Sequence, residues 1–93
     1  RVALVDADFR RPRVQTYFNL QFEPGIINVI SKEATIEQAL RPTEIQPNLY
    51  LVTTGGRPKN PGELVSSEEF NNIINQLRER VDYVLIDSPP VLP

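Results

Sequence analysis

The chain has 93 residues, enough for one small domain or a piece of a larger one, and a formal net charge of −2. The chain as a whole therefore lacks the excess positive charge with which proteins bind nucleic acid. It contains no Cys and no His, which excludes disulfides, thiolate chemistry, an imidazole base and a His-ligated zinc site. Any catalysis therefore falls to carboxylates and arginines. No apolar run approaches the roughly 18 residues that span a bilayer.

Both ends of the sequence indicate that residues 1–93 are an internal fragment of a single domain. It begins with Arg1 rather than Met and leads directly into a strand. It stops six residues after Asp87, where an α/β sheet normally continues into a helix.

The first predicted element is a strand over residues 2–6, because a short continuous apolar run indicates burial on both faces, as in a parallel sheet. The strand ends in two acids, Asp6 and Asp8, with Arg10 two positions further on. Arg11-Pro12 ends regular structure. The side chains expected to pack the irregular or short helical stretch that follows are Val14, Tyr17 and Phe18.

Short helical segments come next. Pro24-Gly25 is a turn, and the apolar cluster over 26–30 predicts one or two helical turns. Thr35 and Gln38 fit a capping box that starts a helix. Pro42 closes this helix, because the residue before a proline resists helical geometry. The sequence predicts a loop from there to the next strand.

The second half of the chain predicts a strand over 48–54, a helical region, and a third strand over 81–87. Asn60-Pro61-Gly62-Glu63 is a helix start, with Asn as cap and Pro at the first helical position. Ser66 and Glu69 are in register for a second start. An apolar stripe with helical spacing follows, and we assign it to the core. Its members are Phe70, Ile73, Ile74 and Leu77.

This order of elements predicts an α/β fold with a mostly parallel sheet. Ligands bind outside the carboxyl ends of such strands, where Asp6, Asp8 and Asp87 are expected. Mg²⁺ binds through one or two carboxylates together with substrate phosphates, and Arg10 could neutralise a phosphate. The sequence thus indicates an acidic edge suited to a metal and a polyphosphate.

Simpler interpretations stay open at each of these positions. An acid at a strand end is often a turn residue or a helix cap. Arg10, with its neighbours Arg11 and Arg13, could form a solvated basic face. The segment from Asn60 to Leu64 could be only a helix start, or it could touch a nucleotide or a neighbouring subunit.

The motifs together resemble bacterial tyrosine kinases. Ala3 to Arg10, three apolar residues followed by Asp-x-Asp-x-Arg, is similar to the Walker A′ motif of that family. Val84 to Pro90, three apolar residues and then Asp-x-x-Pro, is similar to its Walker B motif. Arg10-Arg11-Pro12 and the segment from Asn60 to Leu64, preceded by Gly55-Gly56, resemble the family too. The resemblance covers nearly the whole chain.

The resemblance implies part of a doubly wound P-loop NTPase sheet with flanking helices, related to the Min/Par deviant-Walker ATPases. It implies ATP, Mg²⁺ and autophosphorylation of a tyrosine cluster, often between subunits of a homo-oligomeric ring. These enzymes regulate polymerisation and export of capsular or exopolysaccharide. They act in the cytoplasm at the inner face of the cell membrane, beside or fused to a membrane chain-length-determinant domain that activates them. No nucleic-acid partner is implied.

The same resemblance assigns roles to individual residues. Asp6 and Asp8 match the Walker A′ acids and Asp87 the Walker B acid; all three are expected to coordinate Mg²⁺, largely through water. Asp6 and Asp8 are also the candidates for activating the tyrosine hydroxyl, and the sequence does not distinguish which is the base. Arg10, Asn60 and Pro61 are expected on the nucleotide side.

The sequence departs from the family in having no P-loop, G-x-x-x-x-G-K-[ST], and no tyrosine-rich tail. The P-loop strand is therefore missing, and we expect the fragment alone to be inactive. Three alternatives stay open: a Min/Par-like partitioning ATPase, a non-catalytic partner domain of a polysaccharide export complex, and an unrelated Asp-x-Asp glycosyltransferase or phosphatase. A tyrosine-rich C-terminus would favour the kinase, and loss of the P-loop lysine would favour the non-catalytic partner.

Overall fold

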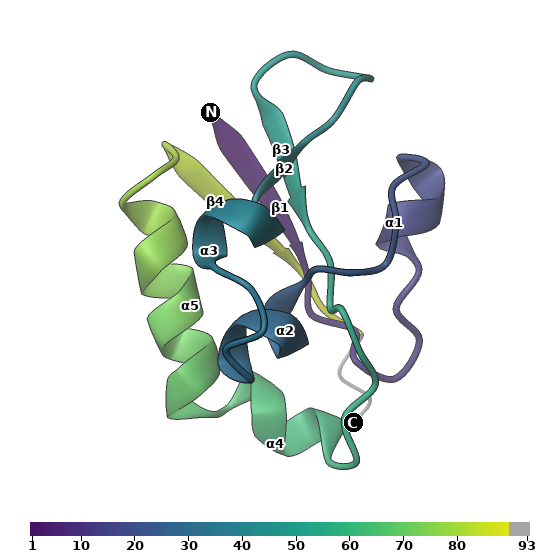
Figure 1. The fold of residues 1–93 in the computed structure, drawn as a ribbon, viewed down its shortest axis with the longest axis vertical. Helices are drawn as coiled ribbons and strands as arrows, with labels where there is room; N and C mark the ends of the chain where they lie inside the picture. The colour runs from purple at the N-terminus through teal and green to yellow at the C-terminus, as the bar shows by residue number, and fades with distance from the viewer. Residues whose placement is uncertain (90–93) are drawn as a thin grey trace.

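A four-stranded sheet in the order β2-β3-β1-β4 forms the centre of the computed structural model, which describes residues 1–89. β1 (Val2–Asp6) lies in parallel between β3 (Leu49–Val52) and β4 (Tyr83–Asp87). The predicted mostly parallel α/β sheet is confirmed, and Figure 1 shows these strands running side by side. Pro90 of the Walker B-like segment and residues 91–93 lie outside the described residues.

The strand β2 (Arg41–Pro42) corrects the prediction of a loop at this point in the sequence. It pairs antiparallel with β3 at the edge of the sheet. Pro42 can take this place because a proline without an N–H is tolerated on an edge strand. Arg41 fastens the edge, since its Nη2 donates to Thr53 Oγ1 at 3.0 Å.

Three helices cover one face of the sheet: α2 (Ile26–Ile30), α3 (Ile36–Ala39) and α5 (Glu68–Arg78). Figure 1 places α1 (Val14–Tyr17) on the opposite side, and α4 (Pro61–Val65) beyond the carboxyl ends of the strands. The core lies between the sheet and the three helices, so the predicted stripe on α5 is largely confirmed. The buried residues of this core include Val5, Phe9, Ile26, Ile36, Val52, Phe70, Ile73 and Leu77.

The predicted capping residues are confirmed at the start of α3, and at the start of α5 the cap lies one residue later than predicted. The capping box is present: Gln38 N donates to Thr35 Oγ1 at 3.1 Å, and Thr35 N donates to Gln38 Oε1 at 2.9 Å. The cap of α5 is Ser67 rather than Ser66, because Ser67 Oγ accepts from Phe70 N at 3.1 Å.

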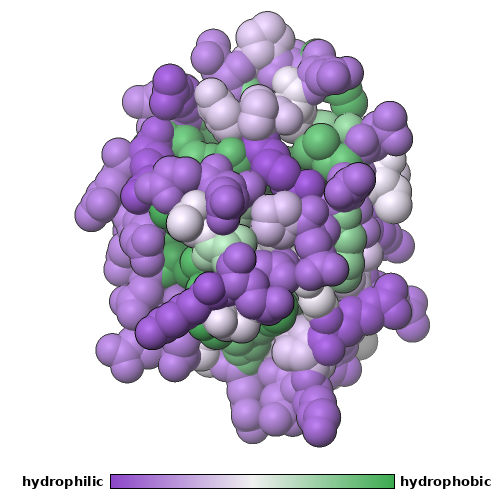
Figure 2. Space-filling view, viewed as in Figure 1, coloured by the Kyte–Doolittle hydropathy of each residue, from purple (hydrophilic) through white to green (hydrophobic). Residues whose placement is uncertain are grey.

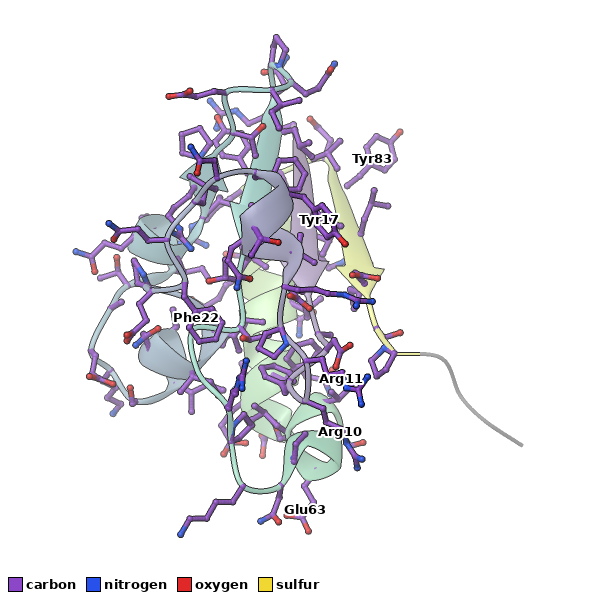
Figure 3. The ribbon with its side chains drawn as sticks, turned by 90° about the vertical axis from the view of Figure 1, so that its right-hand side faces the viewer. Arg10, Arg11, Tyr17, Phe22, Glu63 and Tyr83 are labelled. Atoms are coloured by element: carbon purple, nitrogen blue, oxygen red, sulfur yellow. The ribbon has the colours of Figure 1, made fainter. Side chains whose placement is uncertain are left out.

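The second face of the sheet is less covered than the first. The prediction that Tyr17 packs after the first strand is wrong: Val14 is buried, but Tyr17 is 70% exposed. Tyr83 is exposed as well, and Figure 3 shows both tyrosine side chains at the surface. In the view of Figure 2 the surface is mostly hydrophilic, with apolar residues visible in recesses. Among residues 1–89, no helix has the length and apolar character that crossing a membrane requires.

Candidate functional site

The acidic ends of the first and last strands meet, as the sequence predicted. Asp6 of β1 and Asp87 of β4 are register partners in the parallel ladder. Ala7 N donates to the Asp87 carbonyl oxygen at 2.8 Å, so the pairing continues one residue past β1. This extension fixes the backbone next to Asp8 relative to the end of β4.

Asp6 is completely buried, and both of its carboxylate oxygens accept backbone hydrogen bonds. Oδ1 accepts from Asp8 N at 2.9 Å. Oδ2 accepts from Arg13 N and from Val14 N, each at 3.3 Å. The side chain therefore joins the end of β1 to the start of α1, across the loop that carries Asp8 and Arg10.

Burial raises the pKa of the Asp6 carboxyl above its ordinary value. The hydrogen bonds from Asp8, Val14 and Arg13 oppose this shift, because they stabilise the ionised form. The negative charge of Asp87 adds to it. The desolvation of a charge at this position is thus only partly compensated.

Asp8 and Asp87 are more accessible than Asp6. Asp8 is half-buried, and its Oδ1 accepts from Arg11 N at 3.1 Å. This is a turn interaction, so the simpler interpretation of Asp8 as a turn residue is confirmed. Asp87 is exposed, and no residue in 1–89 donates a hydrogen bond to its carboxylate.

The described residues do not arrange the three acids as a ready metal cluster. Within residues 1–89, no group of three or more acidic side chains is placed to hold a metal ion. The accessible carboxylates nonetheless fit Mg²⁺, which needs only one or two protein oxygens when waters and phosphates supply the rest. Asp8 and Asp87 meet that requirement, whereas the oxygens of Asp6 are already occupied.

Arg10 and the segment around Asn60 lie together although fifty residues separate them. They line one cavity of about 370 Å³, whose residues are Arg10, Lys59, Asn60, Pro61, Gly62 and Glu63. A smaller cavity of about 60 Å³ links Asp8 and Arg10 with Pro61. Figure 3 shows Arg10 close to Glu63 of α4. Asn60 precedes α4 as predicted, but its side chain makes no capping hydrogen bond.

Sequence reasoning did not single out Phe9, which lies between Asp8 and Arg10. Its side chain is 2% exposed and meets the Phe70 ring of α5 edge-on, with centroids 6.1 Å apart at 80°. The loop is therefore anchored in the core. A large aromatic residue between two polar ones was the available signal.

Known proteins that resemble the chain are bacterial tyrosine-protein kinases. "Tyrosine-protein kinase ptk" of Acinetobacter johnsonii is 42% identical over 92 residues, which is 99% of this chain and 12% of that protein. "Putative tyrosine-protein kinase CapB" of Staphylococcus aureus is 33% identical over 91 residues, 98% of this chain and 40% of that protein. The chain thus spans well under two thirds of either relative. No protein-family model matches it.

Solved structures agree with these relatives. The chimerical protein CapA2B2 has a TM-score of 0.87 and 34% identity, over 97% of this chain and 39% of that one. The septum site-determining protein MinD of Pyrococcus horikoshii, complexed with Mg-ADP, has a TM-score of 0.74 and 20% identity, over 99% and 37%. At that identity the second likeness shows the fold alone.

The sheet and its helices thus form part of the fold that CapA2B2 and MinD share. Within that fold, the resemblance seen in the sequence is confirmed: the chain matches bacterial tyrosine-protein kinases over 98–99% of its length.

Proposed function

We propose that the chain is part of an ATP-dependent protein-tyrosine autokinase domain that regulates polymerisation and export of a capsular polysaccharide or exopolysaccharide. The observation that carries the proposal is the pairing of Asp6 with Asp87, because it unites the Walker A′-like and Walker B-like strand ends at one edge. Relatives that are named tyrosine-protein kinases match over 98–99% of the chain, which supports the same activity.

Phosphoryl transfer depends mainly on positioning and charge neutralisation, and the accessible residues of this edge can contribute to both. Asp8 and Asp87 offer carboxylate oxygens for Mg²⁺, which when bound neutralises charge on the phosphates. Of the pair Asp6 and Asp8, only Asp8 is exposed enough to accept a proton from a tyrosine hydroxyl. Arg10 would neutralise a phosphate, and Asn60 with Pro61 would contact the nucleotide side.

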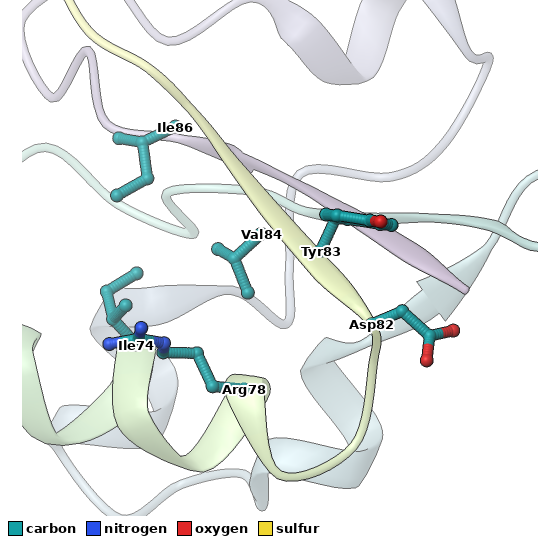
Figure 4. Close-up of a pocket in the computed structure, with 6 residues that line it drawn as sticks. All are labelled: Ile74, Arg78, Asp82, Tyr83, Val84 and Ile86. Carbon is teal, nitrogen blue, oxygen red and sulfur yellow. The ribbon is translucent and has the colours of Figure 1, made fainter.

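We also propose that residues 1–93 are an internal part of one P-loop domain whose phosphate-binding strand pairs with β4. The outer edge of β4 has no strand partner within residues 1–89. Leu85 and Ile86 are 55% and 47% exposed there, and an exposed apolar edge is a site where another strand pairs. A groove of about 420 Å³ lies between α5 and β4 (Figure 4). Its lining includes Ile74, Arg78 and Val84.

The proposed setting is the cytoplasm, at the inner face of the cell membrane. There the full-length protein would form a homo-oligomeric ring and act beside a membrane chain-length-determinant domain that activates it. The likeness to the chimerical protein CapA2B2 supports a fused or bound partner.

The test uses the full-length protein with Mg²⁺ and ATP, and measures phosphotyrosine by mass spectrometry. We expect labelling in the wild type, and a loss of about 100-fold or more in Asp8→Asn and Asp87→Asn, the scale of a lost acid–base or metal contribution. Glu44→Gln is the matched control, because it removes an exposed acid from the β2–β3 connection. ATP turnover without phosphotyrosine, even with the membrane domain present, would reject the kinase and favour the partitioning ATPase.

A further inference from the structure

The carboxylate of Asp6 has no free approach for a metal ion. The residue is 0% exposed, and each oxygen already accepts backbone N–H groups. Direct coordination would require the packing that encloses the side chain to open, and at Oδ2 it would also displace Arg13 N and Val14 N. A buried N–H that loses its acceptor is unfavourable, so coordination would disrupt the loop that holds the site.

The same hydrogen bonds determine where the accessible groups stand. The carboxylate oxygens of Asp6 accept hydrogen bonds from backbone N–H groups at both ends of the segment 8–14. This segment contains Asp8 and Arg10. Within the segment, the Phe9 ring is held against Phe70. The segment therefore has a polar anchor at Asp6 and an apolar anchor in the core.

We propose that Asp6 is a positioning residue: its buried carboxylate organises the backbone of residues 8–14, and metal binding and proton acceptance fall to Asp8 and Asp87. This separates two acids that the sequence pattern treats as a pair. The inference rests on the proposed function only in the roles given to Asp8 and Asp87. The role of Asp6 in holding the loop stands on the hydrogen bonds alone.

Two variants of the full-length protein test the division of roles by two independent measurements. Hydrogen–deuterium exchange over residues 8–14 reports the loop, and Mn²⁺ binding in the presence of ATP reports the metal. In Asp6→Asn, we expect exchange to accelerate by about 10-fold or more, because an amide presents an NH₂ group where the Asp6 carboxylate accepts two N–H bonds. Mn²⁺ should still bind. In Asp8→Asn, Mn²⁺ affinity should fall while exchange at residues 13–14 stays at the wild-type rate.

Autophosphorylation kinetics add a third measurement. Asp6→Asn should retain measurable kcat and show a raised KM for Mg–ATP, because the accessible carboxylates remain but are less well placed. Asp8→Asn should instead lose kcat. Loss of Mn²⁺ binding in Asp6→Asn with unchanged exchange over 8–14 would overturn the proposal.

A measurement on the wild type keeps the test decisive if Asp6→Asn does not fold. Adding Mg²⁺ and ATP should leave the exchange of residues 13–14 unchanged or slow it. If Asp6 became a metal ligand, the packing that encloses its carboxylate would open and exchange within residues 8–14 would accelerate, which would refute the positioning role. Absence of phosphotyrosine in the wild type would reject the kinase proposal but not the result on the loop.

Discussion

Replacing Gly55 by alanine should destabilise the protein far more than replacing an unobstructed glycine. Gly55 follows β3 with φ of +72°, a left-handed conformation that side chains other than glycine rarely adopt. A Cβ there would lie 2.7 Å from Gly25 N and would also press on Asn28 Oδ1. These two atoms form a buried hydrogen bond of 2.8 Å, donated by Gly25 N, which ties the start of α2 together.

The expected cost of Gly55→Ala has two parts. The left-handed conformation costs alanine about 1–2 kcal/mol. Displacing Asn28 leaves a buried N–H without its acceptor, which costs about 1–3 kcal/mol. The sum of about 2–5 kcal/mol is a large share of the roughly 5–14 kcal/mol that a chain of this length is expected to have.

Urea unfolding of the purified 93-residue chain, followed by circular dichroism, measures this change. We expect the midpoint to fall with an unchanged slope. Gly62→Ala is the matched control, because its Cβ would meet nothing within 4 Å; in α4 it should stabilise by about 0.5–1 kcal/mol. Gly55→Asn separates the two costs, since asparagine tolerates the left-handed region but keeps the contact. If Gly55→Ala and Gly62→Ala have equal midpoints, the reasoning is wrong.

The remaining predictions concern a helix cap, the sheet edge and pH. Ser67→Ala should lower the free energy of unfolding by about 1 kcal/mol, while Ser66→Ala should change it by less than about 0.5 kcal/mol; urea midpoints compare them. Leu85→Lys should reduce self-association of the isolated chain in sedimentation velocity, because a charge blunts an exposed edge, and an unchanged monomer fraction would contradict this. The ordinary pKa of an aspartate carboxyl is 3.8, and the pKa of Asp6 in the folded protein is raised above it. As the pH rises between these two values, the unfolded state loses its proton first, so the free energy of unfolding should decrease. In metal-free buffer, Asp6→Asn should lack this fall.

The elements predicted best from sequence are those with strong periodicity or local chemistry. The continuous apolar runs identified β1 and β4, the stripe from Phe70 identified α5, and Thr35 with Gln38 identified the start of α3. β2 escaped prediction because a two-residue edge strand has no periodicity and its Pro42 was sufficiently explained as a helix terminator. The choice between two adjacent serines as the cap of α5 depends on backbone dihedral angles that their sequence does not specify.

The site was predictable at the level of which strand ends meet. Parallel strands place their carboxyl ends at one edge, so a shared location for Asp6 and Asp87 followed from the order of elements. The cavity shared by Arg10 and Asn60 was not predictable by spacing, because it depends on how α4 packs across the end of the sheet.

The roles of Asp6 and Asp8 depend on the path of the chain after the strand. Two acids separated by one residue are equivalent in the pattern Asp-x-Asp, and both could face an incoming ligand. The chain then returns so that Arg13 and Val14 present their N–H groups to the first acid, and burial completes its enclosure. The next residue but one, Asp8, is only half-buried. The side chain that enters the core at this point of the loop is that of Phe9, which packs on Phe70. The difference between the two acids is therefore made by backbone donors seven and eight residues away from Asp6 and by one aromatic contact. On the proposed roles, substitution of either acid should lower activity, and loop exchange, metal binding and the change in kcat or KM distinguish their functions.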